Sequence, residues 1–161
     1  MGIQEELRLQ NPILNQAHET VLGIVFTGSL LTKLGGRLLR RFDLTDAQFN
    51  ILMLLRHQAE GGRMTQTRLG EMLLVNRSNV TGLVDRLERD GLVRRIADPE
   101  DRRINLVELT VAGLERLEQA KQDYYDYIET VMAGLSEEQR KALAGLLENV
   151  RRQVRNNGYG Q

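Results

Sequence analysis

The spacing of the hydrophobic residues changes along this chain, and that change limits the possible folds more than any other feature. Over residues 11–90 and 110–155, hydrophobic residues recur every three or four positions, which is typical of amphipathic helices. Between Leu92 and Leu109 the period falls to two, which is typical of short strands. The sequence therefore predicts a mainly α fold with one small β-hairpin.

Six helices are predicted, and capping residues mark where several of them begin. Thr45 with Gln48 and Ser136 with Gln139 each form the pattern of a capping box. Gly35-Gly36 weakens the first helix and leaves a kink there open. The predicted helices cover residues 11–41, 45–57, 65–73, 77–90, 110–133 and 136–155.

The middle of the chain has the order of a winged helix-turn-helix domain. A short helix, a tight turn at Val75-Asn76 and a second helix come first. Strands at 92–97 and 104–109 follow, joined by a charged tip from Asp98 to Arg103. This order allows the second helix to enter a DNA major groove. An ordinary corner of two helices is the alternative.

The helix over residues 77–90 has an apolar face and a polar face. Val80, Val84 and Leu87 define the apolar face. Arg and Asn side chains can read guanine and adenine, and Ser or Thr suits bases or phosphates. The alternative is a solvated face with a pair between Asp85 and Arg89. The polar residues are Arg77, Ser78, Asn79, Thr81, Gly82, Asp85, Arg86 and Arg89.

The chain has 22 basic and 22 acidic residues, and its net charge is zero. It is therefore not a polycation of the kind that coats nucleic acid through bulk charge. The segment from Arg63 to Arg103 contains nine Arg and seven Asp or Glu residues, so its net charge is +2. A modest local charge suits a binder that depends on geometry.

Several function classes find no support in the sequence. Without cysteine, the chain has no disulfide, zinc–cysteine site or catalytic thiol, and His18 and His57 are isolated. No catalytic or phosphate-binding motif occurs, so no enzyme, cofactor or metal is expected. The start of the chain does not resemble a secretory signal. The most apolar stretch, Val21 to Leu31, is short for a membrane span, so we expect a cytoplasmic protein without membrane contact.

The hairpin region and the helix before it contain two sequence motifs that are typical of a known protein family. Residues 91–113 read Gly-Leu-Val-Arg-Arg-Ile, then Asp-Pro-Glu-Asp-Arg-Arg, then Val-Glu-Leu-Thr and Ala-Gly, and Val80 to Glu88 precede them. With these motifs and its helix order, the chain resembles the MarR (multiple antibiotic resistance regulator) family of bacterial transcription factors. The resemblance implies a homodimer that binds double-stranded DNA. It implies dimerisation helices at 1–44 and 111–161 around a winged helix-turn-helix domain at 45–110.

The resemblance also implies the DNA-contacting residues. Arg103 matches the wing-tip arginine that enters the minor groove, and Asp101 matches the acid that steadies it. Gly82 departs from a common pattern with a longer side chain, which puts one base contact in doubt. The residues implied to face the major groove are Arg77, Ser78, Asn79, Thr81 and Arg86.

The function implied is transcriptional regulation on a pseudo-palindromic operator with half-sites ~10 bp apart. Repression is the expected mode, and the sequence leaves activation open. Family members often bind a small aromatic or phenolic effector that alters DNA affinity. The alternative is a winged-helix module that binds proteins and not specific DNA. The sequence names neither the operator nor the effector. Expected effector-site residues, each also explicable as core or surface, are Phe26, Leu30, Phe49, Met53 and Arg56.

Overall fold

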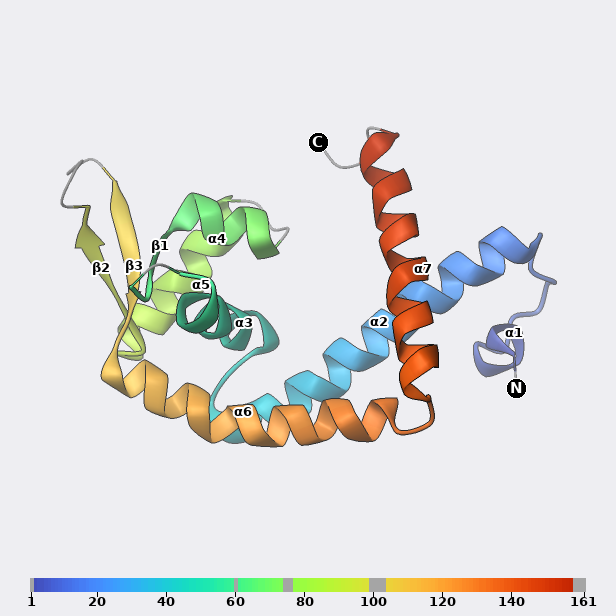
Figure 1. The fold of residues 1–161 in the computed structure, drawn as a ribbon, viewed down its shortest axis with the longest axis horizontal. Helices are drawn as coiled ribbons and strands as arrows, with labels where there is room; N and C mark the ends of the chain where they lie inside the picture. The colour runs from blue at the N-terminus through green and yellow to red at the C-terminus, as the bar shows by residue number, and fades with distance from the viewer. Residues whose placement is uncertain (1, 60, 74–76, 99–103, 158–161) are drawn as a thin grey trace. The chain divides into compact units, whose positions relative to one another are not determined.

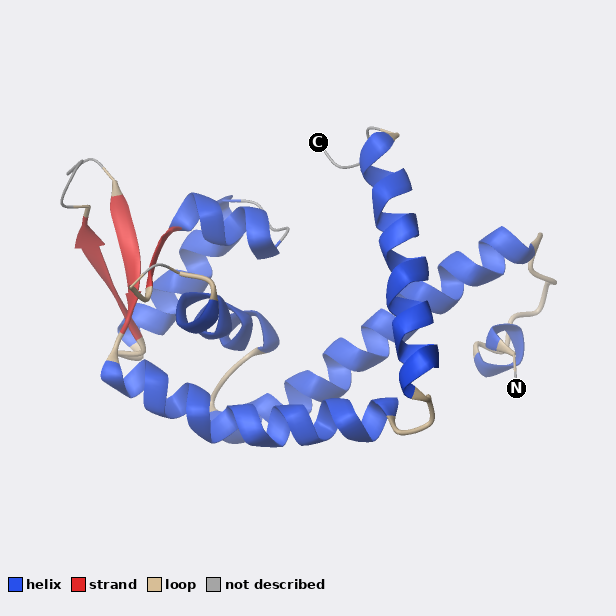
Figure 2. Cartoon of the chain, in the orientation of Figure 1, coloured by secondary structure: helices blue, strands red, loops and turns tan. Residues whose placement is uncertain are grey.

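The computed structural model describes residues 2–59, 61–73, 77–98 and 104–157. Figure 1 shows the order of the elements, and Figure 2 separates the small sheet from the helices. The chain divides into two compact units, Met1–Tyr124 and Tyr125–Gln161. The first unit contains all three strands and the helices that pack around them.

The N-terminal part is a short helix α1 (Ile3–Glu6) and a long helix α2 (Gln16–Leu39), which a 3-10 turn η1 (Arg40–Phe42) extends. The predicted start of the long helix at residue 11 is wrong. Asn15 is its N-cap, because the Asn15 side chain accepts a hydrogen bond from the His18 backbone N–H at 2.9 Å. The helix continues through Gly35-Gly36, where Gly35 is buried.

Local capping explains the start of the next two helices. Helix α3 (Asp46–His57) begins with the predicted capping box: Thr45 Oγ1 accepts from Gln48 N at 3.2 Å, and Gln48 Oε1 accepts from Thr45 N at 2.9 Å. Helix α4 (Gln66–Leu73) follows Thr65, whose hydroxyl accepts from Arg68 N at 3.1 Å. Helix α5 (Arg77–Arg89) ends before Gly91, whose φ of 72° requires glycine.

The predicted hairpin is confirmed. Strand β2 (Val93–Ala97) pairs antiparallel with β3 (Asn105–Leu109), so that Val93 lies opposite Leu109. A third strand, β1 (Arg63–Thr65), pairs with the other edge of β3 and was not predicted. Three residues are too few to show a period. The turn before β1 needs positive φ at Gly61 and Gly62, and Leu109 N donates to Gly62 O at 3.2 Å.

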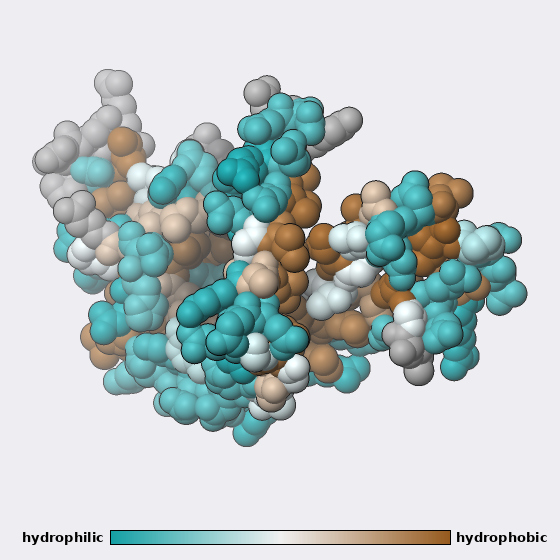
Figure 3. Space-filling model, turned by 45° about the vertical axis from the view of Figure 1, so that its right-hand side comes forward, coloured by the Kyte–Doolittle hydropathy of each residue, from teal (hydrophilic) through white to brown (hydrophobic). Residues whose placement is uncertain are grey.

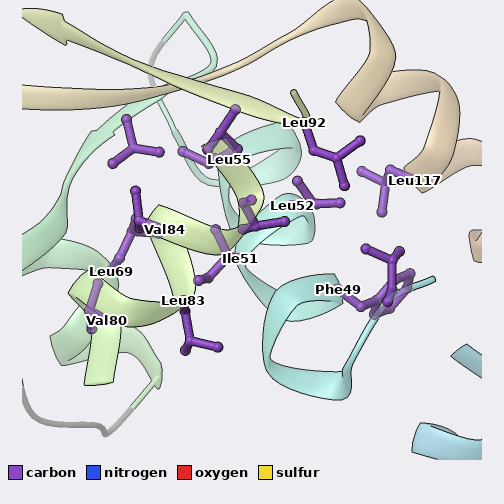
Figure 4. Packing of buried hydrophobic residues seen from close by; sticks show 14 of the residues in the cluster. Phe49, Ile51, Leu52, Leu55, Leu69, Val80, Leu83, Val84, Leu92 and Leu117 are labelled. Atoms are coloured by element: carbon purple, nitrogen blue, oxygen red, sulfur yellow. The ribbon is translucent and has the colours of Figure 1, made fainter. Parts of the chain in front are cut away.

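One hydrophobic core holds this domain together, and it lies between α3, α5 and the sheet. Figure 4 shows side chains from α3, α4 and α5, together with Leu92 and Leu117, gathered in this core. Burial of each such side chain contributes ~1.5–3 kcal/mol. The core therefore sets the position of α5. Its fully buried members include Phe49, Ile51, Leu52, Leu55, Leu69, Val80, Val84, Leu87 and Leu117.

Helix α6 (Val111–Met132) begins at Thr110, whose Oγ1 accepts from Gly113 N at 3.0 Å. Helix α7 (Glu137–Asn156) begins with the predicted second capping box, in which Ser136 Oγ accepts from Gln139 N at 3.3 Å and Gln139 Oε1 accepts from Ser136 N at 2.8 Å. Both predicted starts are confirmed, because a cap is a local interaction that the sequence carries.

Helices α2 and α7 each expose hydrophobic side chains. Figure 3 shows such side chains on the surface, including one side of α7, whose other side is hydrophilic. No residue of α7 is buried within this chain. The most exposed large side chains of the two helices are Val21, Val25, Leu34, Leu146 and Val154.

Among the described residues, one helix is long and apolar enough to cross a membrane by length and composition alone, and it covers Gln16–Phe42. This helix is longer than the apolar stretch from Val21 to Leu31, on which the expectation of no membrane span was based. The core helix of a soluble protein and a signal sequence both pass the same test of length and composition.

Candidate nucleic-acid interface

Helix α5 turns one face to the core and leaves the other open. Val80, Val84 and Leu87 are fully buried, which confirms the predicted apolar face. Each large apolar side chain on that face anchors the helix, so the polar face is presented on a rigid support. Within residues 78–89 of α5, the exposed residues are Ser78, Asn79, Asp85, Arg86 and Arg89.

The structure places the predicted major-groove residues along this helix. Ser78 and Asn79 are exposed in its first turn, where backbone N–H groups and the helix dipole favour a phosphate. Arg86 is exposed two turns further along, and Arg77 is the first helical residue. Thr81 is half-buried, and its hydroxyl lies 3.2 Å from the side-chain amide of Gln66 on α4.

The predicted minor-groove residues, Asp101 and Arg103, lie outside the described residues.

Gly82 lies within α5, and a Cβ added there would meet no atom within 4 Å. No packing among the described residues requires glycine at that position, so on this side of α5 a longer side chain would have room.

Three ionic side chains join α5 to the hairpin. Arg95 on β2 pairs with both Asp85 and Glu88, and the Arg95 backbone N–H also donates to Glu88 Oε1 at 2.8 Å. The pair of Asp85 with Arg89, named as the alternative in the sequence analysis, does not form: Asp85 pairs with Arg95, and Arg89 Nε lies 3.3 Å from Asp90 Oδ1.

The charge of Arg95 is secured by these contacts. Desolvation lowers the pKa of Arg95, but hydrogen bonds and charge interactions with Asp85 and Glu88 raise it by more, so the pKa lies above its usual value. The guanidinium remains a cation whose side chain is 23% exposed.

Sequence reasoning missed Arg95, although the chain carries a signal for it. Alternation along β2 puts Arg95 on the same face as the buried Val93, so its charge points inward. An inward arginine requires carboxylate partners, and Asp85 and Glu88 stand three residues apart on the preceding helix. The sequence therefore indicates that Arg95 needs an acidic partner, and the structure shows that Asp85 and Glu88 of α5 are the acids it pairs with.

A second ionic cluster links the three strands. Glu108 on β3 accepts from Arg94 Nε on β2 and lies 2.9 Å from Arg63 Nε on β1. Its side chain is only 12% exposed. The hydrogen bond from Arg94 is the largest cause that lowers the pKa of Glu108, and the Arg63 charge adds to it against desolvation. Glu108 is therefore ionised at neutral pH and connects both edges of the sheet.

The expected effector-site residues divide between core and surface. Phe49 is buried, and its ring centroid lies 4.6 Å from that of Tyr124 on α6. Met53, one turn further along α3, packs partly buried against the same core, while Arg56 is exposed. On α2, Phe26 is half-buried and Leu30 is exposed. The structure thus brings Phe49 and Met53 together and adds Tyr124, which the sequence did not suggest.

The end of α2 is joined to α6 by polar contacts. Arg116 Nη1 donates to the Phe42 carbonyl at 2.8 Å and lies 3.7 Å from Asp43 Oδ2. Arg41 Nη1 lies 3.2 Å from Asp123 Oδ2. The helices on either side of the middle domain therefore meet at the residues that lead into α3.

Among the described residues, no group of three or more His, Asp or Glu is arranged to hold a metal.

Comparisons with known proteins agree with this geometry. The sequence model of the MarR family matches residues 42–104. The Bacillus subtilis HTH-type transcriptional repressor YetL is 38% identical to this chain over 104 residues. The matched segment covers 65% of this chain and 62% of YetL. An uncharacterized HTH-type transcriptional regulator of Bacillus cereus is 33% identical over 122 residues, 73% of this chain and 77% of the relative.

Solved structures share the fold. Sco3205, a MarR family transcriptional regulator from Streptomyces coelicolor in complex with DNA, superposes with a TM-score of 0.79. The two are 26% identical, and the match covers 90% of this chain and 92% of the other. The predicted winged helix-turn-helix fold is therefore confirmed.

Proposed function

This chain belongs to the MarR family of transcriptional regulators, and from that premise we propose that it is a homodimeric repressor whose DNA affinity a small effector changes. The membership confirms two predictions, the family itself and the absence of an enzymatic role. One observation carries the proposal: helix α5 buries its apolar face in the core and exposes polar side chains on its other face.

Helix α5 suits the major groove. Asn79 can pair with the adenine edge and Arg86 with guanine or a phosphate, while Ser78 and Arg77 lie at the helix start, where phosphates bind. Thr81 adds a hydroxyl between these turns. In this proposal, Asp101 and Arg103 at the hairpin tip reach the neighbouring minor groove, whose negative potential attracts arginine.

A second copy of the chain is the proposed partner of the exposed apolar faces. Contiguous apolar surface of this kind marks an interaction site on a soluble protein. Val25 on α2 and Leu146 on α7 are 62% and 64% exposed in the single chain. A two-fold dimer would bury these faces in residues 1–44 and 111–161 and would place two α5 helices ~10 bp apart on a pseudo-palindrome.

The proposed effector is a small aromatic or phenolic molecule. Phe26, Leu30, Phe49, Met53 and Arg56 supply apolar walls and one cation for it. A ligand beside Phe49 would compete with Tyr124 for the ring. Since Tyr124 belongs to α6, binding would favour one arrangement of the helices over another and shift DNA affinity with it. A repressor acts where the DNA is, so we place the protein in the cytoplasm.

A DNA titration tests the proposal. The full chain is titrated onto its own upstream DNA and onto random DNA of equal length, at several salt concentrations. We expect a preference for the upstream DNA and a negative slope of log affinity against log salt. Equal affinity for both DNAs, or no binding at any salt concentration, would contradict it and favour the protein-interaction alternative.

A further inference from the structure

We propose that Arg95 is a positioning residue, which fixes the hairpin to helix α5 and so sets how the two DNA-contacting elements stand relative to each other. This inference rests on the proposed DNA-binding function. It assigns no DNA contact to Arg95. Its basis is the connection that Arg95 makes between three elements of the first unit.

The guanidinium of Arg95 uses all three of its nitrogens. Nη1 donates to Glu88, and Nη2 donates to Asp85, one turn apart on α5. Gln66 on α4 satisfies both of its neighbours when its amide nitrogen donates to Thr81 Oγ1 at 3.2 Å and its oxygen accepts from Arg95 Nε at 2.9 Å. One side chain thus connects α4, α5 and β2.

These contacts are placed where they control orientation. The core residues of α5 prevent the helix from leaving the domain, but β2 and β3 extend beyond the core toward the hairpin tip. The Arg95 backbone N–H also donates to Glu88, so both the main chain and the side chain of β2 are attached to α5. A planar, three-nitrogen fork resists rotation better than a single hydrogen bond does.

The same contacts explain two acids on a helix that would face DNA. Asp85 is 58% exposed and Glu88 is 37% exposed, and negative charges there repel phosphates. Their removal should therefore increase affinity for any DNA if they have no other role. If they hold Arg95, their removal should instead decrease affinity for the operator, and this difference in sign makes the proposal testable.

The test uses three variants of the full chain that keep or raise its positive charge. Arg95→Lys keeps the charge and removes the fork. Glu88→Gln removes one acid and leaves Arg95 in place. Arg94→Lys is the matched control, since Arg94 is the next residue on β2 and pairs with Glu108 of the sheet rather than with α5. Affinity for the chain's own upstream DNA, taken as the operator probe, and for random DNA of equal length is measured for each variant, with thermal unfolding to confirm that each is folded.

We expect Arg95→Lys and Glu88→Gln each to reduce the ratio of operator to random affinity about tenfold. Glu88→Gln should bind random DNA more tightly than the natural chain, and Arg95→Lys should keep the same salt slope because its charge is unchanged. Hydroxyl-radical footprints should lose protection where the hairpin lies and keep it where α5 lies. Arg94→Lys should stay within about twofold of the natural ratio.

Three outcomes would overturn the inference. Glu88→Gln could raise both affinities equally, Arg95→Lys could keep the natural ratio, or Arg94→Lys could lose as much as Arg95→Lys. In each of these cases the natural chain still prefers its operator, so the proposed function stands. A natural chain with no operator preference would remove the proposed function and this inference together.

Discussion

At the scale of single residues, Gly113 and Gly82 differ in whether the structure leaves room for a larger side chain. Gly113 lies in the first turn of α6, where an added Cβ would come within 2.0 Å of the Leu92 carbonyl oxygen. That oxygen belongs to the backbone and also accepts from Thr110 N, so it cannot move away easily. Gly82 on α5 has open space around it. In the sequence, Gly82 and Gly113 are both simply glycines within predicted helices, and only the structure separates them.

We therefore expect Gly113→Ala to lower the free energy of unfolding by about 3 kcal/mol, because the clash forces α6 away from β2. Gly82→Ala should raise it by about 0.5–1 kcal/mol, since alanine favours the helix. Urea unfolding followed by circular dichroism measures both. Equal effects of the two substitutions would show that the close approach at Gly113 is absent.

At the scale of elements, the sheet illustrates how short strands gain stability from charged side chains. β1 has only three residues, and its pairing with β3 is supported by Arg63, which shares the Glu108 carboxylate with Arg94 of β2. A nearly buried carboxylate between two arginines connects all three strands. Main-chain hydrogen bonds of such short strands alone give marginal stability.

This cluster predicts a pH dependence. The pKa of Glu108 in the folded chain lies below its ordinary value of 4.5. Its ionised form therefore stabilises the fold fully above the ordinary pKa, and this contribution is lost as pH falls through the lower, folded-state pKa. Glu108→Gln should reduce the free energy of unfolding by roughly 1 kcal/mol at pH 7, and natural and variant chains should converge at acidic pH.

The measurement is urea unfolding from pH 7 down to pH 3. Glu71→Gln serves as the control, because Glu71 pairs with Arg68 on the exposed surface of α4 and its loss should change stability by less than about 0.5 kcal/mol. A constant difference between Glu108→Gln and the natural chain over the whole pH range would contradict the assignment.

At the scale of the whole molecule, the exposed apolar side of α7 matters most. Leu143, Leu146, Val150 and Val154 lie along one side of a helix without a buried residue in the single chain. These side chains are 40–64% exposed, so burial against a second copy would contribute, for each of them, only the corresponding part of the ~1.5–3 kcal/mol that full burial gives. The regulator's two DNA-reading helices depend on that dimer in the proposed function.

Leu146→Glu should weaken self-association at least tenfold, because a carboxylate would have to enter an apolar interface. Arg152→Glu introduces the same residue on the opposite side of α7 and should leave the association intact. Sedimentation equilibrium over a range of concentrations measures both. A natural chain that remains monomeric at high concentration would exclude the dimer, and equal weakening by the two variants would place the interface elsewhere.

Interactions between residues a few positions apart could be predicted from the sequence alone. The capping boxes at Thr45 and Ser136, the apolar side of α5 and the period-two hairpin all arise from interactions within about four residues or one strand. Contacts between residues far apart in the chain became visible only in the folded molecule: β1 pairs with β3, Phe49 contacts Tyr124, and Asp85 pairs with Arg95 rather than Arg89. Local interactions repeat with a period that the sequence displays, whereas a distant contact leaves no period and is settled by which elements the core brings together.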